Sequence, residues 1–158
     1  MAKHQRLATK SQHLKLTIEL VPSSSWKNNL RGLLKPSMWK EISDMVVKKH
    51  GGKCIICGRI GKLHAHEVWE YDNKNHIQKL EDIIPLCYNC HMVKHIGFAS
   101  LQQSKFGKDN ERFIKHFMKV NNVGRSGYQE HLKEEIEKFN NRSHFEWQLN
   151  LENLAKFQ

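Results

Sequence analysis

The four cysteines of this chain fall in two pairs of identical spacing, and this pattern limits the possible folds more than any other feature. The pairs are Cys54 with Cys57 and Cys87 with Cys90. Two intervening residues allow both thiolates of a pair to face one ion, and two such pairs supply the four ligands of a closed tetrahedral zinc site. The alternatives are two disulfides, which a reducing compartment disfavours, or four unrelated buried thiols. The sequence therefore predicts that these cysteines bind a structural Zn²⁺.

The composition indicates where the protein works and what it binds. Its 158 residues suit one domain, and 26 Lys and Arg against 16 Asp and Glu give a net charge of +10. Such an excess favours a polyanion such as DNA or RNA as a partner, although a basic surface without a partner would show it too. The basic first residues lack the apolar segment of a secretion signal, and no apolar run approaches the roughly 20 residues that span a bilayer. We therefore expect a cytoplasmic protein without a membrane partner.

We expect a single domain over residues 1–158, divided into four parts. The parts are a basic arm (1–12), a strand followed by helices (13–52), a zinc-bound core (53–97) and a helical extension (98–158). In the second part, apolar and polar residues alternate from His13 to Val21, which predicts a strand. A serine at 23–25 is expected to cap a short helix, and Ser37 a longer helix that stops at Gly51.

The core and the extension follow the same kind of argument. A strand is expected from Ile60 to Tyr71, a turn at 72–75, a return strand from His76 to Leu80, a crossing from Glu81 and a helix from Cys90 to His95. In the extension, Asp109 and Ser126 are expected to cap two helices. The apolar residues from Trp147 to Leu154 are expected to pack back on the core.

Histidines are concentrated in the core. Of eleven in the chain, five lie between the first cysteine and the end of the core: His64, His66, His76, His91 and His95. His91 and His95 are four residues apart on one helical face, so they can meet the strand that carries His66. With Asp82 they can hold one Mg²⁺, Mn²⁺, Ni²⁺ or Zn²⁺ that leaves coordination positions open for a phosphate oxygen. A nearby His or Glu would take the proton of the attacking water.

The stretch from Cys54 to Gly97 resembles the HNH nucleases, also called ββα-metal nucleases. The most specific parts are the paired cysteines and the segment Asp82-Ile-Ile-Pro-Leu-Cys-Tyr-Asn-Cys-His91. The resemblance implies an α+β fold in which a zinc-stapled ββα-metal core carries helical additions at both ends. It also implies a metal-dependent endonuclease that hydrolyses DNA phosphodiester bonds, with His66, Glu67, Asp82 and His91 as catalytic residues.

Two positions depart from the family pattern. The family has a metal ligand followed by a general-base His where this chain has His66 and Glu67, and an Asn where it has Asp82. Either His66, His91 and His95 bind the catalytic metal and Glu67 is the base, or His66 is the base and Ala65 replaces the usual ligand. His64 is left open between a fourth ligand and a surface residue.

These departures keep a second function open. The same fold, retained without catalysis, would bind nucleic acid, a nucleotide or a host protein, as in a phage or mobile-element protein that acts on a host pathway. For the nuclease, a phosphate track is expected at Lys94, Lys105, Lys108 and Arg125. Two nearby nicks would require a homodimer. The remaining histidines of the extension are expected at the surface: His116, His131 and His144.

Overall fold

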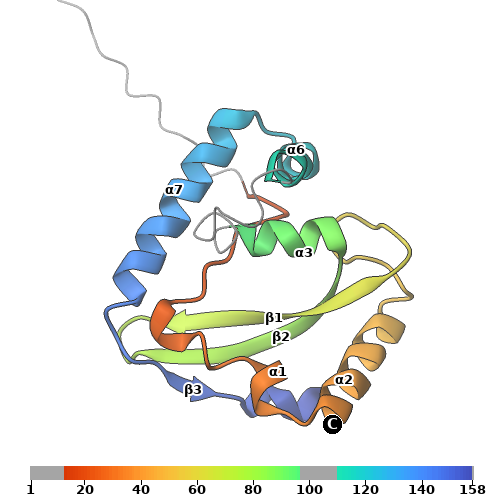
Figure 1. Cartoon of the computed structure of the whole chain (residues 1–158), viewed down its shortest axis with the longest axis vertical. Coiled ribbons are helices and arrows are strands. Elements are labelled where there is room, and N and C mark those ends of the chain that lie inside the picture. The colour runs from red at the N-terminus through yellow and green to blue at the C-terminus, as the bar shows by residue number, and fades with distance from the viewer. Residues whose placement is uncertain (1–12, 97–109, 158) are drawn as a thin grey trace, which may run out of the picture.

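The computed structural model describes residues 13–96 and 110–157, which form an α+β fold around a long hairpin (Figure 1). The hairpin consists of β1 (Leu63–Asp72) and β2 (Ile77–Cys87), which pair antiparallel. A short third strand, β3 (Gln148–Asn150), lies parallel to β2 and completes the order β1-β2-β3. β1 is therefore an edge strand. In the described part of the chain, no helix is long and apolar enough to cross a membrane.

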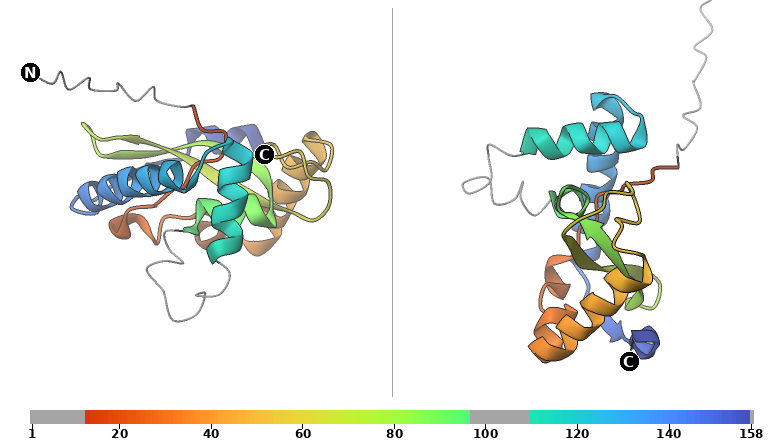
Figure 2. Two further views of the ribbon diagram at one scale, coloured as in Figure 1. Left: turned by 90° about the horizontal axis from the view of Figure 1, so that it is seen from above. Right: turned by 90° about the vertical axis from the view of Figure 1, so that its right-hand side faces the viewer.

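Helices cover both faces of the hairpin. Their bounds are α1 (Leu30–Leu33), α2 (Pro36–Lys49), α3 (Tyr88–Lys94), α6 (Asn110–Asn121) and α7 (Arg125–Arg142), with 3₁₀ turns at Ser23–Ser25 and Glu152–Phe157. Figures 1 and 2 show α3, α6 and α7 on one side of the hairpin and α1, α2 and the C-terminal turn on the other. The helical additions at both ends of the core are thus present, as predicted.

Alternation along the hairpin separates two apolar cores. Side chains of a strand point alternately to opposite faces, so Ala65 and Ile83 pack with α2 and the C-terminal turn. Leu86 packs on the other face with α3, α6 and α7. His66 is paired with Ile84, on the face toward α3, whereas its neighbour Glu67 is paired with Ile83. The pleat therefore gives His66 and Glu67 different surroundings.

The second strand is longer than the sequence analysis predicted. It continues through Glu81 to Cys87, where a crossing was expected. The pairing register shifts between Val68 and Trp69, and the partners there, Asp82 and Leu80, leave Glu81 as the extra residue. A bulge of this kind lets a strand continue past an extra residue. As a result, β2 delivers Cys87 directly to the start of α3.

The segment from His13 to Val21 is extended but is not a strand, which corrects the prediction. Its apolar residues are buried at alternate positions, as the pattern required: Leu16, Ile18 and Leu20. Its backbone hydrogen bonds go to helices instead of a sheet. The Leu16 N–H donates to Asn121 Oδ1 (2.9 Å), the Ile18 N–H to His131 Nε2 (2.9 Å) and the Glu19 N–H to the Lys94 carbonyl (3.0 Å).

Three helix starts also differ from the expectation. Asn29 caps α1 by accepting the Gly32 N–H (2.8 Å), so no serine of 23–25 does so. Pro36 begins α2 with Lys35 at the N-cap, because proline suits the first helical position. Gly124 precedes α7, so Ser126 lies inside it. Asp109 lies outside the described residues. The predicted end of α2 was correct, since Gly51, with a φ of +63°, comes shortly after the last residue of the helix.

The C-terminal tail packs on the core, as predicted. Trp147 and Leu154 are buried, and so is Phe157. The Gln148 N–H donates to the His76 carbonyl (2.8 Å), which ties the tail to the hairpin turn. The formation of β3 was not predicted, because three residues give too short a pattern.

Asn121 offers a test of how the extended segment is held. Its amide accepts the Leu16 N–H and donates to the Leu16 carbonyl (2.8 Å), so Asn121→Ala leaves two backbone groups of a buried segment unpaired. We expect the free energy of unfolding to fall by roughly 1–3 kcal/mol. Asn141→Ala, at an exposed position of α7, is the matched control and should change it little. Chemical denaturation of both variants measures the difference; equal stabilities would contradict this role.

His131 makes the same attachment dependent on pH. Its Nε2 accepts the Ile18 N–H and must stay unprotonated, and burial lowers its pKa below the ordinary value of 6.5. Below that pH the unfolded chain takes up a proton that the folded chain refuses, so the free energy of unfolding falls as the pH falls. His131→Gln, which keeps an acceptor without a titrating ring, should flatten this slope. His144→Gln, at an exposed ring, should leave it unchanged in denaturation curves between pH 7.5 and 5.

Candidate metal centre

The four cysteine sulphurs meet at one point. All four Sγ atoms lie within 4.8 Å of one another, and those of Cys57 and Cys87 are 3.6 Å apart. Four sulphurs at about 2.3 Å from one tetrahedral zinc would be separated by roughly 3.8 Å. The predicted set of Cys54, Cys57, Cys87 and Cys90 is therefore confirmed as a cluster with the spacing that a structural zinc requires.

Local backbone geometry presents these sulphurs. The first pair lies in a tight turn before β1, in which the Gly58 N–H donates to the Cys54 carbonyl (2.8 Å) and Gly58 has a φ of +74°. A side chain would be strained at that φ. The second pair spans a junction, since Cys87 ends β2 and Cys90 lies in α3. The Ile55 N–H donates to the Pro85 carbonyl (3.1 Å), which joins the turn to β2.

Within the cluster, the thiolate form is favoured at Cys54 and the thiol form at Cys90. The pKa of the Cys54 thiol is lowered because its sulphur accepts hydrogen bonds from the Cys90 thiol and from backbone N–H groups. The pKa of Cys90 is raised by that same hydrogen bond, by burial and by the charge of the other thiolates. A divalent cation would remove this repulsion, because it binds all four sulphurs as thiolates.

His116 belongs to the surroundings of this cluster, although a surface position was expected. Its Nε2 lies 3.1 Å from Cys90 Sγ, and burial lowers the pKa of its ring, so the neutral imidazole can donate to the sulphur. Hydrogen bonds from such neighbours tune ligand basicity and orientation. Nothing in the local sequence indicates this role, because 26 residues separate the two positions.

A second cluster joins the hairpin to α3. One ligand atom each of His66, His91 and His95 lies within 4.8 Å of the others. The Nε2 atoms of His91 and His95 are 3.2 Å apart, close to the roughly 3.3 Å between two nitrogens on one tetrahedral ion. Burial, with the neighbouring histidines, lowers the pKa of His91 to about 3 and of His95 to about 4. Both rings are therefore neutral near pH 7, as ligands must be.

Glu19 reaches this cluster from the extended segment, and sequence reasoning missed it. Its Oε2 lies 2.8 Å from His66 Nε2, and its Oε1 pairs with the ammonium of Lys94. Burial raises the pKa of Glu19, but the hydrogen bond from His66 and the charge of Lys94 outweigh it and hold the pKa at about 2. A permanently charged carboxylate therefore sits at the histidine cluster. The only sequence signal is an acid within an alternating apolar segment.

The other predicted catalytic residues lie outside the cluster of three histidines. The Glu67 carboxylate accepts the Leu30 N–H (2.6 Å) at the start of α1, and Asp82 is exposed and accepts the N–H of its neighbour Ile83 (2.8 Å). His64, which the sequence left open, stacks in parallel on His91 with ring centroids 5.3 Å apart. His64 therefore lies directly beside one of the three clustered histidines.

The residues expected to track phosphates are differently placed. Lys94 is 5% exposed and donates to Thr17 Oγ1 (2.8 Å) as well as to Glu19, so its ammonium is not at the surface. Arg125 is half exposed and pairs with Glu111. Lys105 and Lys108 lie outside the described residues. Near the histidine cluster, burial lowers the pKa of His64, and the charges of the exposed Lys62 and Arg31 lower it further.

No family model, no curated protein and no solved structure matches this chain. The structure bears out the two metal-ligand clusters in a ββα-like arrangement, and no match confirms membership of the HNH nucleases.

Removal of metal tests the cysteine cluster. Because a structural zinc supplies folding free energy directly, a strong chelator should lower the melting temperature by roughly 10 °C or more, and added Zn²⁺ should restore it. Cys54→Ser should reproduce the loss and reduce the zinc content measured by elemental analysis. Ile55→Ser, in the same turn but half exposed, is the matched control. Unchanged stability without zinc would contradict a structural site.

Proposed function

We propose that the protein is a metal-dependent nuclease that hydrolyses DNA phosphodiester bonds at the cluster of His66, His91 and His95. The observation that carries this proposal is that three imidazoles converge where a hairpin meets a helix whose first residues also belong to a four-cysteine site. Three protein ligands leave coordination positions open, which is the property of catalytic rather than structural metal sites.

Each residue of the cluster has a distinct task. His66, His91 and His95 would hold a divalent ion, which would supply polarisation of a phosphate oxygen and stabilisation of the charge of the leaving group. Glu19 fixes the ring of His66 through its 2.8 Å contact and adds a negative charge that strengthens cation binding. Lys94 holds the Glu19 carboxylate in turn, which explains why a lysine is buried here.

The proton of the attacking water requires a base. His64 stacks on His91. Its ring forms no hydrogen bond with any of the described residues, so it is available to accept a proton. Glu67 is engaged in capping α1, and we infer that His64 is better placed than Glu67 to accept the proton. Asp82 remains a candidate from the exposed part of β2, two residues from Ile84, which pairs with His66.

Substrate binding follows from the charge near the cluster. Arg31 and Lys62 are exposed, and both act electrostatically on His64. We propose that they contact the phosphates on either side of the scissile bond, in place of the buried Lys94. Their contribution should be weakened by salt, as for any phosphate contact.

Cleavage of supercoiled plasmid tests this function. We expect nicking with Mg²⁺, Mn²⁺ or Ni²⁺ and none with EDTA. His91→Ala should lower the rate by at least about 100-fold while zinc content and melting temperature stay close to native, because only the second ion loses a ligand. His144→Ala, at an exposed ring, is the control. Cleavage by His91→Ala at the native rate would reject the assignment.

Comparison of three further variants assigns the base. His64→Asn should lower the rate strongly, and Glu67→Gln and Asp82→Asn only modestly. A protein that carries both metals, binds DNA and cleaves it with none of these ions would instead support the second function, a non-catalytic binding module. The engagement of Glu67 as a helix cap is the observation that favours that alternative.

A further inference from the structure

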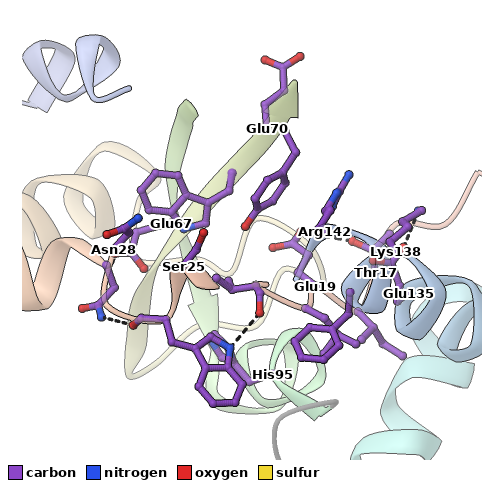
Figure 3. Close-up of a pocket in the computed structure, with 18 of the residues that line it drawn as sticks. Thr17, Glu19, Ser25, Asn28, Glu67, Glu70, His95, Glu135, Lys138 and Arg142 are labelled. Carbon is purple, nitrogen blue, oxygen red and sulfur yellow. Dashed lines mark hydrogen bonds and ion pairs between the residues drawn. The ribbon is translucent and has the colours of Figure 1, made fainter. Parts of the chain in front are cut away.

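A cavity of about 750 Å³ opens beside the histidine cluster (Figure 3). It lies along the edge of β1 that pairs with no other described strand, between β1, the extended N-terminal segment and α7. His66, His95 and Glu19 are among the residues that line it. Its size is within the range of small-molecule sites, which is roughly 300–1,000 Å³. Two of the proposed metal ligands are therefore accessible from this cavity.

Aromatic side chains form much of the wall. Trp26, Trp69, Tyr71 and Phe139 all line the cavity, from the N-terminal segment, from β1 and from α7. Tyr71 is held in place by the Arg142 guanidinium, which lies 4.3 Å from its ring centroid, and by edge contact with Trp147 at 5.0 Å. Aromatic walls of this kind favour a flat, unsaturated ring as the occupant.

Two lining hydroxyl groups lack hydrogen-bond partners. Ser25 is 1% exposed, and neither its Oγ nor the Tyr71 hydroxyl is bonded to any group in the described part of the chain. Burial also raises the pKa of Tyr71, so its hydroxyl keeps its proton and can donate. Unpaired buried hydroxyls are rare in native proteins and call for an explanation. Both oxygens are buried, so a ligand with donors and acceptors along its edge would pair with them when the side chains turn toward the cavity.

The charges around the cavity exclude a phosphate from its interior. Four carboxylates line it (Glu19, Glu67, Glu70 and Glu135) against two permanent cations, Lys138 and Arg142. Lys138 already pairs with Glu135 (2.6 Å), and Arg142 stacks on Tyr71 and donates to Asn73 (3.1 Å). Figure 3 shows Glu70 pointing away from the other labelled side chains, and this carboxylate approaches Lys79. Because most of these charged side chains already have partners within the protein, the cavity suits a neutral occupant.

We propose that the cavity binds a single nucleobase, unstacked from its strand, while the phosphate of the same nucleotide lies at His66, His91 and His95. This inference rests on the proposed function for the position of the phosphate. A nucleobase is flat, neutral and edged with donors and acceptors, so it matches the aromatic wall, the charge balance and the free hydroxyls together. Enzymes that handle unstacked bases use stacking and edge hydrogen bonds in this way.

The test compares nucleotides with and without a base. The full-length, metal-loaded protein is titrated with dAMP, dGMP, dCMP or dTMP and with 2-deoxyribose 5-phosphate, and binding is followed calorimetrically. At least one mononucleotide should bind ten times or more tightly than the sugar phosphate. Tyr71→Phe should weaken that binding by roughly three- to tenfold, the effect of one hydrogen bond, and leave the sugar phosphate unaffected.

Tyr128→Phe is the matched control, because Tyr128 is a buried tyrosine that does not line the cavity. It should bind all probes as the native protein does. Equal affinity for mononucleotides and the sugar phosphate, or no binding of either, would overturn the base site. Base-dependent binding without plasmid cleavage would keep the base site and reject the nuclease, whereas cleavage without base preference would do the opposite.

Discussion

The convergence of four sulphurs is the constraint on which the rest of the structure depends. Cys54 and Cys57 precede β1, Cys87 ends β2 and Cys90 lies in α3, so one ion would fasten three elements together. Leu63, the first residue of β1, is paired with Cys87. This pairing sets the register of β1 against β2, and the register sets the position of His66 along the strand relative to α3. The histidine cluster and the cysteine cluster are thus built on the same hairpin and helix.

A second, ionic network attaches the N-terminal segment to that core. Glu19 connects His66 on β1 with Lys94 on α3, and both partners are nearly buried. Burying charges is costly unless each is paired, so such a network favours one arrangement of its elements over others rather than adding much stability. Asn121 and His131 secure the same segment from α6 and α7. The N-terminal segment thereby closes one side of the cavity beside the histidines.

The sequence was a good guide wherever the relevant residues are close together. The cysteine spacing, the i, i+4 pair of His91 and His95 and the glycine stop of α2 are local signals, and each was correct. It was a poor guide wherever a side chain meets a distant partner. Lys94 looks like a surface cation of a helix, and only the arrival of Glu19, 75 residues earlier, explains its burial. His116 and His131 were misplaced for the same reason.

By itself, the sequence determined that the chain is basic, that four thiols gather at one site and that three histidines can meet beside it, because spacing along a strand or a helix fixes which side chains share a face. Only the tertiary structure decided that β2 runs to Cys87, that Glu67 caps a helix and that Glu19 joins the histidines. It also created the cavity, whose walls come from segments more than 100 residues apart. Long-range packing determines such neighbours, and local patterns contain no information about it.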